Sequence, residues 1–158
     1  MPPSVAERSR VQAVWNGYRR LLVPMAANPE SERAVEVACR LAAEHNASVA
    51  VLTVVEVSPL LPLDARMDEE ERQARALQER AQEIADAYGV SMIQCRVRAR
   101  QAAAAILDEL ERREVDLVVL GAGRRRRLSK QATPFGPTVQ HVLRRSSRPV
   151  LLVAPPLP

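Results

Sequence analysis

An unbroken apolar run, followed at once by a glycine-bearing basic segment, constrains this chain more than any other feature. Residues 117–120 are all Leu or Val, and such a run is typical of a parallel strand that helices cover on both faces. Gly121 and Gly123 come next, followed by four consecutive arginines. In an open α/β sheet, ligands bind at the carboxyl ends of the strands, and glycine lets the backbone approach a phosphate closely. The sequence therefore predicts a parallel α/β sheet with an anion site after this strand.

The rest of the chain alternates between strand and helix patterns. Apolar runs predict further strands over residues 20–25, 48–57, 93–97 and 150–153, the third of them at a sheet edge. Apolar residues at three-and-four spacing predict helices from Pro29 to Asn46, from Met67 to Tyr88, over 103–110 and after Gly136. Because strand and helix alternate throughout, each parallel pair needs a right-handed crossover. The prediction is a doubly wound α/β domain.

Composition narrows the class of protein. The chain has 158 residues, 47% of them hydrophobic, which suits one globular domain. It has neither the roughly 20-residue apolar run of a bilayer-spanning helix nor the apolar block of a signal peptide, so we expect a cytoplasmic protein. Cys39 lies inside a predicted helix and Cys95 inside a predicted strand, with no second pair of ligands at metal spacing. We expect two reduced core thiols and no metal site.

Charge is distributed unevenly along the chain. All 19 acidic residues and 15 of the cations lie at or before Asp116, which gives this part a net charge of −4. The eight cations that follow it are accompanied by no acidic residue. Such asymmetry predicts an anionic partner for the carboxyl-terminal third, whether phosphate groups, a nucleic acid or an acidic surface. A solvated basic face is the alternative.

Four short stretches together resemble the universal stress protein family. They are Arg20-Leu-Leu-Val-Pro, Pro29-Glu-Ser-Glu-Arg-Ala-Val, Asp116-Leu-Val-Val-Leu-Gly and Arg148-Pro-Val-Leu-Leu-Val. The resemblance covers residues 19–154. It implies a three-layer α/β/α fold like that of the adenine nucleotide alpha hydrolases, with a five-stranded parallel sheet in the order 3-2-1-4-5. The domain is then expected over residues 19–158, and residues 1–18 form an extension, for which apolar residues at helical spacing predict an amphipathic helix.

Many members of this family bind ATP through a loop of the pattern Gly-x-x-Gly-x9-Gly-(Ser/Thr) after the fourth strand. The resemblance implies a set of positions that contact an adenine nucleotide, ATP or another. These are Pro24, Met25, Ala26, Val51, Val54, Gly121, Gly123, Arg124, Arg126, Gly136, Pro137 and Thr138. Core packing alone is the alternative reading of the two valines.

The candidate nucleotide loop departs from the family pattern. If Gly121 is the first motif glycine, Arg124 replaces the second and the segment to Gly136 is two residues too long; if Gly123 is first, Arg126 replaces the second. Pro137 stands where the family has Ser or Thr, and Thr138 comes one place late. Ala26 stands where ATP-binding members carry an aspartate after the first strand. Each change removes a polar contact. An arginine in place of the second motif glycine nevertheless has donors for a phosphate.

Two hypotheses follow from these departures. The protein is either a nucleotide-binding stress or signalling module that uses Arg124 to Arg127, or a regulatory interaction domain with weak or lost ATP binding. The Ala26-Ala-Asn-Pro form of the first loop looks more like the stress-protein domains attached to membrane transporters, which favours the second hypothesis and a transporter or signalling protein as a separate partner. Neither His45 nor His141 has a nucleophile or carboxylate partner in local sequence, so we expect no catalytic residue.

The last predicted strand is a candidate dimer interface. Residues 150–153 are strongly apolar and fall at a sheet edge in the expected strand order. Unpaired backbone groups at such an edge favour pairing with a symmetric copy. The sequence therefore predicts a homodimer joined near this strand.

Overall fold

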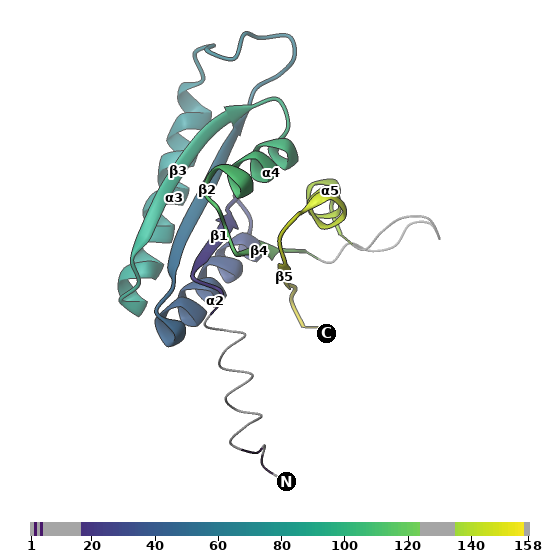
Figure 1. Cartoon of the computed structure of the whole chain (residues 1–158). Helices are drawn as coiled ribbons and strands as arrows, with labels where there is room; N and C mark the ends of the chain where they lie inside the picture. Colours follow the sequence, from purple (N-terminus) through teal and green to yellow (C-terminus); the bar gives the residue numbers. More distant parts are fainter. Residues whose placement is uncertain (1, 3, 5–16, 124–134, 157–158) are drawn as a thin grey trace.

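The computed structural model describes residues 2, 4, 17–123 and 135–156. Within them a five-stranded, all-parallel sheet has the order β3-β2-β1-β4-β5 (Figure 1). The elements, in chain order, are β1 (Arg20–Pro24), α2 (Pro29–His45), β2 (Ser48–Glu56), α3 (Asp68–Tyr88), β3 (Met92–Ala99), α4 (Ala102–Arg112), β4 (Leu117–Gly121), α5 (Pro137–Arg145) and β5 (Val150–Val153). The predicted fold class and strand order are confirmed.

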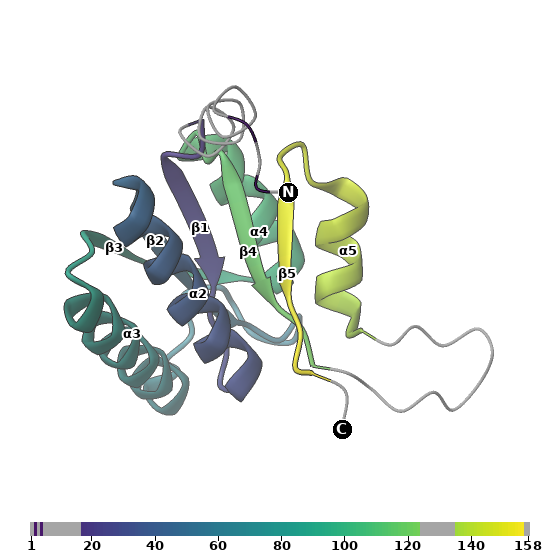
Figure 2. The ribbon, with the colours of Figure 1, turned by 90° about the horizontal axis from the view of Figure 1, so that it is seen from below.

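Helices cover both faces of the sheet, as Figure 2 shows. The alternation of side chains along the strands explains this, because successive residues point to opposite faces. Val49 and Val51 of β2 join one buried cluster with α2 and α3, whereas Ala50 and Leu52 join a second cluster with α4 and α5. Each helix therefore needs only one apolar face, which matches the three-and-four spacing of the sequence.

The ends of the first two described helices follow from local sequence. Asn28 caps α2, since its Oδ1 accepts a hydrogen bond of 2.8 Å from the Ser31 N–H, and Pro29 occupies the first helical turn. Asn46 ends α2 with a φ of 53°, and Gly89 ends α3 with a φ of 66°. Both lie in the left-handed region that terminates helices. These boundaries agree with the sequence to within a residue.

Both cysteines are free and buried, as predicted. Burial raises the pKa of the Cys39 thiol to about 11 and also raises the pKa of the Cys95 thiol. Neutral thiols in apolar surroundings are unreactive.

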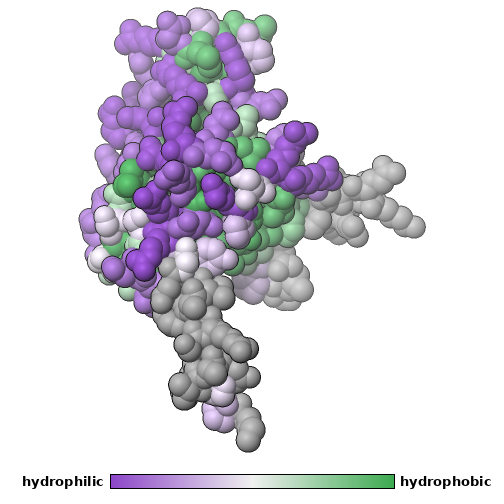
Figure 3. Space-filling view, in the orientation of Figure 1, coloured by the Kyte–Doolittle hydropathy of each residue, from purple (hydrophilic) through white to green (hydrophobic). Residues whose placement is uncertain are grey.

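A loop between β2 and α3 exposes leucines but is fixed by arginines. Leu60 is 93% exposed, and hydrophobic colour appears in Figure 3 at the end of the molecule where this loop lies. Arg98 of β3 donates to the Leu63 carbonyl at 3.1 Å, and Arg100 donates to the Leu61 carbonyl at 2.7 Å. The loop is therefore held by guanidinium bonds rather than by burial of its own side chains.

Two predictions concern the ends of the chain and its relation to membranes. The helix predicted within residues 1–18 falls outside the described residues, except for residues 2, 4, 17 and 18. In the part of the chain that the structure describes, no helix is both long enough and apolar enough to span a bilayer.

Candidate functional site

A cleft of about 770 Å³ opens at the carboxyl ends of β1, β2 and β4. This is the edge at which open α/β sheets bind ligands. The cleft is lined by nine of the positions predicted to contact a nucleotide, namely Pro24, Met25, Ala26, Val54, Gly121, Gly123, Gly136, Pro137 and Thr138. Segments more than 100 residues apart in sequence thus meet at one place.

The three other predicted positions do not line this cleft in the described structure. Val51 is fully buried, in the cluster between the sheet and α2 with α3. It lies five residues before the carboxyl end of β2, and its side chain is packed in that cluster rather than exposed at the strand ends. Arg124 and Arg126 fall outside the described residues.

The loop between β1 and α2 is closed by hydrogen bonds within itself. The Ala26 N–H donates to Ser31 Oγ at 3.1 Å, and the Asn28 N–H donates to the Ala26 carbonyl at 2.8 Å. Ser31 is buried, with 5% of its surface exposed, and its own N–H is the donor to Asn28. Three backbone N–H groups of the loop and the first turn of α2 therefore already have partners there, and Ala26 brings no polar side chain.

Two glycines, one at the end of β4 and one just after it, are required by the first turn of α2. A Cβ on Gly121 would lie 2.2 Å from the Glu30 carbonyl oxygen, so any side chain there would collide with backbone. A Cβ on Gly123 would lie 2.9 Å from Glu30 Oε1. The carboxylate of Glu30 therefore lies directly against Gly123, at the start of the segment that was predicted to hold phosphate.

The described lining of the cleft is acidic. It includes Glu30, Glu56 and Glu70 but no lysine or arginine. Glu56 Oε1 accepts a hydrogen bond of 2.9 Å from the Ala102 N–H and so caps α4, whose own N-cap residue makes no side-chain bond. Neither Glu30 nor Glu70 forms an ion pair with another described residue. None of these three glutamates was among the positions that the sequence predicted to contact a ligand.

Apolar side chains and a few polar groups form the walls. Val54, Leu77 and Ile106 come from three different elements. Thr53 is 2% exposed, and its hydroxyl has no hydrogen-bond partner among the described residues. A buried hydroxyl without a partner costs about 1–3 kcal/mol, so this group favours a ligand or a water molecule in the cleft. Apolar walls with few polar groups are typical of sites for small organic ligands.

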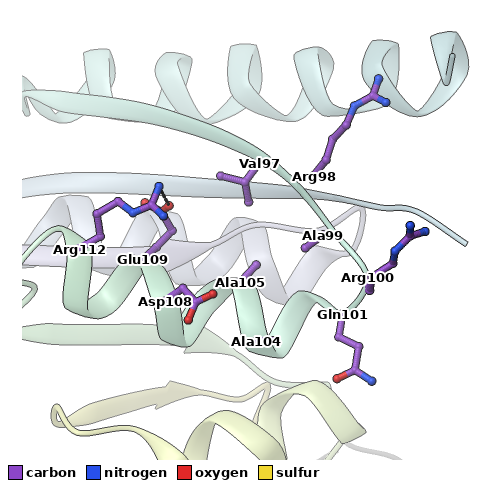
Figure 4. Close-up of a pocket in the computed structure, with 10 residues that line it drawn as sticks. All are labelled: Val97, Arg98, Ala99, Arg100, Gln101, Ala104, Ala105, Asp108, Glu109 and Arg112. Atoms are coloured by element: carbon purple, nitrogen blue, oxygen red, sulfur yellow. Dashed lines mark ion pairs between the residues drawn. The ribbon is translucent and has the colours of Figure 1, made fainter. Parts of the chain in front are cut away.

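A second pocket, of about 530 Å³, lies between the end of β3 and α4. Figure 4 shows that Arg98 and Arg100 extend in a similar direction, away from Asp108. Glu109, whose side chain is 5% exposed, accepts from Arg113 Nε at 2.8 Å and lies 3.6 Å from Arg112 Nη1. Glu109 and Arg98 are paired within the protein, and the charged groups of the pocket do not converge on one point, so it is not a convergent binding site.

A sequence model of the universal stress protein family matches residues 17–154. The chain belongs to this family. No curated protein matches this universal stress protein in sequence.

Solved structures show the same fold. A universal stress protein solved in complex with cAMP is 22% identical over 87% of this chain and 97% of that chain, with a TM-score of 0.68. One from Archaeoglobus fulgidus in complex with dAMP is 17% identical over 86% and 98%, with a TM-score of 0.68. A family member from Arabidopsis thaliana with AMP bound is 15% identical over 87% and 92%, with a TM-score of 0.63. At these identities the likeness establishes the fold of this universal stress protein.

Proposed function

We propose that this universal stress protein is a regulatory binding domain whose cleft takes an adenine-containing ligand and binds ATP weakly or not at all. One observation carries the proposal. The cleft gathers nine predicted nucleotide positions around apolar walls, yet Ala26 and Pro137 present a methyl group and a ring where an aspartate and a hydroxyl were expected. The adenine compounds in the solved relatives support an adenine-type ligand.

The magnitude of the two losses explains why the affinity for ATP is expected to be low. A hydrogen bond to a charged or buried group is worth about 1.5–3 kcal/mol. Loss of two such bonds weakens binding by roughly two to four powers of ten. The Ala26 and Ser31 N–H groups do not replace these bonds, because both already donate within the loop and the first turn of α2.

A binding role fits the described cleft better than a catalytic one. The described lining includes no histidine, cysteine or lysine. His45 ends α2 and His141 lies in α5, and neither lines the cleft. Among the described lining residues, no nucleophile is therefore paired with a histidine or lysine base, as covalent or acid–base catalysis commonly requires.

Calorimetry with ATP, AMP and adenosine on the purified protein tests this proposal. We expect measurable binding of adenosine and a dissociation constant for ATP above 10 µM or so, given the two lost bonds. Copurified ATP or a submicromolar dissociation constant for ATP would contradict it. Failure of all three compounds to bind would leave the domain an interaction module without an adenine ligand.

We further propose that β5 joins two copies into a homodimer in the cytoplasm. β5 lies at the end of the strand order, and its four residues are only half-buried within one chain. Sedimentation should show a dimer at micromolar concentration that Leu151→Arg dissociates. A monomer that is unaffected by the substitution would favour the alternative, in which a transporter or signalling protein pairs with this edge.

A further inference from the structure

We propose that Glu30 is the residue that makes the cleft select an uncharged, nucleoside-like ligand and reject a nucleotide. The inference rests on the proposed function, because it concerns the same cleft. It goes beyond the two missing contacts, since it assigns the rejection of phosphate to a charge that is present.

The position of Glu30 is fixed by the fold. It is the second residue of α2, where the positive end of the helix stabilises a carboxylate. Gly121 brings the backbone of β4 against the Glu30 carbonyl, and Gly123 leaves space that the Glu30 carboxylate occupies. The carboxylate therefore takes the volume beside the glycines that a phosphate would need, and it satisfies the helix dipole that would otherwise attract an anion.

The described charges around Glu30 do not offset it. Of the other two carboxylates in the cleft, Glu56 already caps α4 and Glu70 is exposed. No described cation lines the cleft. A like charge within several ångströms in a partly buried site lowers the affinity for a phosphate by about tenfold or more.

The remaining polar groups of the cleft suit an uncharged ligand. The buried Thr53 hydroxyl can donate and accept, and Gln73, whose Nε2 donates to Glu69 Oε1 at 3.4 Å, offers its amide oxygen at the same cleft. Hydroxyl and amide groups recognise base edges and sugar hydroxyls without requiring charge. Apolar walls from Val54 and Ile106 supply the rest of the contact.

Titration calorimetry with adenosine, AMP and inorganic tripolyphosphate separates the contributions of the base and the phosphates. The proteins are wild type, Glu30→Gln and Glu44→Gln, the last being an exposed glutamate on α2 that does not line the cleft. We expect Glu30→Gln to bind AMP and tripolyphosphate about tenfold more tightly than wild type and to bind adenosine equally. Glu44→Gln should match wild type in all three titrations. Glu30→Ser is a second variant without the charge and should show the same gain. The unfolding curves of both variants should match that of wild type, which excludes misfolding as the cause.

Each result has a distinct meaning. Adenosine binding with an unchanged ratio of AMP to adenosine in Glu30→Gln would overturn the role of Glu30 and leave the proposed function standing. Weaker tripolyphosphate binding by Glu30→Gln would also overturn it, because Glu30 would then hold the basic segment that follows Gly123. A gain in tripolyphosphate binding without any adenosine binding would support the role of Glu30 and remove the adenine ligand. Absence of binding by every variant would overturn both.

Discussion

The cleft at the ends of β1, β2 and β4 and the pocket between β3 and α4 both contain glutamates, but the two regions differ in how those charges are satisfied. In the pocket, Glu109 accepts from Arg113, and the nearby Arg98 is bonded to Glu71 and to loop carbonyls. In the cleft, Glu30 and Glu70 form no ion pair with a described residue. The cleft and the pocket both have polar linings, so polarity alone does not identify a ligand site. A charge that is paired within the protein contributes to stability. A charge without a partner in a cleft attracts or repels the charged groups of a ligand that enters the cleft.

The strongest way to break this comparison is to displace the helix that carries Glu30. Gly121→Ala places a Cβ 2.2 Å from the Glu30 carbonyl oxygen, and backbone cannot move aside as a side chain can. Overpacking of this kind costs about 3 kcal/mol. Urea unfolding should show this loss. Gly123→Ala is the matched control, because its Cβ meets only the flexible end of Glu30, and its cost should stay below about 1 kcal/mol. Equal losses would show that the first turn of α2 can shift.

Replacing one glutamate by glutamine in the pocket and one in the cleft sharpens the comparison. Glu109→Gln takes a carboxylate from two arginines at a site that is 5% exposed, so we expect a loss of about 1–3 kcal/mol. Glu70→Gln removes a charge from the exposed rim of the cleft and should change stability by less than about 0.5 kcal/mol. Thermal unfolding measures both. Similar losses would mean that Glu70 also has a structural partner.

The arginine bonds to the β2–α3 loop give a smaller, local effect. Arg98→Ala removes the ion pair with Glu71 and the bonds to the Leu63 and Ala65 carbonyls. We expect about 1 kcal/mol of lost stability and faster amide exchange over residues 57–67. Arg75→Ala on the exposed face of α3 is the control and should leave exchange in the loop unchanged. Unchanged exchange in Arg98→Ala would show that Arg100 and the prolines fix this loop without Arg98.

Local signals predicted the fold, while the site depended on contacts that no local signal reports. The Asn28-Pro29 start, the Gly89 stop and the apolar alternation of β2 each act within a few residues, so they could be recognised in the sequence. The contact of Glu30 with Gly123 joins residues 93 positions apart. Val51 was expected beside a ligand because of the family resemblance, but its side chain is fully buried in the cluster with α2 and α3.

The smallest predicted effect is on the reactivity of the two thiols, one in each buried cluster. Burial raises the pKa of Cys95, while Arg113 lowers it and Glu109 raises it. Cys39 lies in the other cluster, and its pKa of about 11 is due to burial alone. In Glu109→Gln the carboxylate that raises the pKa of Cys95 is lost, while Arg113, which lowers it, remains. The pKa of Cys95 should therefore fall. The thiolate fraction, and with it the rate of iodoacetamide alkylation in the folded protein at pH 8–9, should rise modestly at Cys95.

Cys39 in the same molecule is the internal control, because a general loosening of the fold would accelerate alkylation at both sites. Mass spectrometry of the two peptides distinguishes the cases. An equal increase at both cysteines would mean that the substitution acts through unfolding, and the view of Glu109 as part of a local, neutralised network would have to be given up.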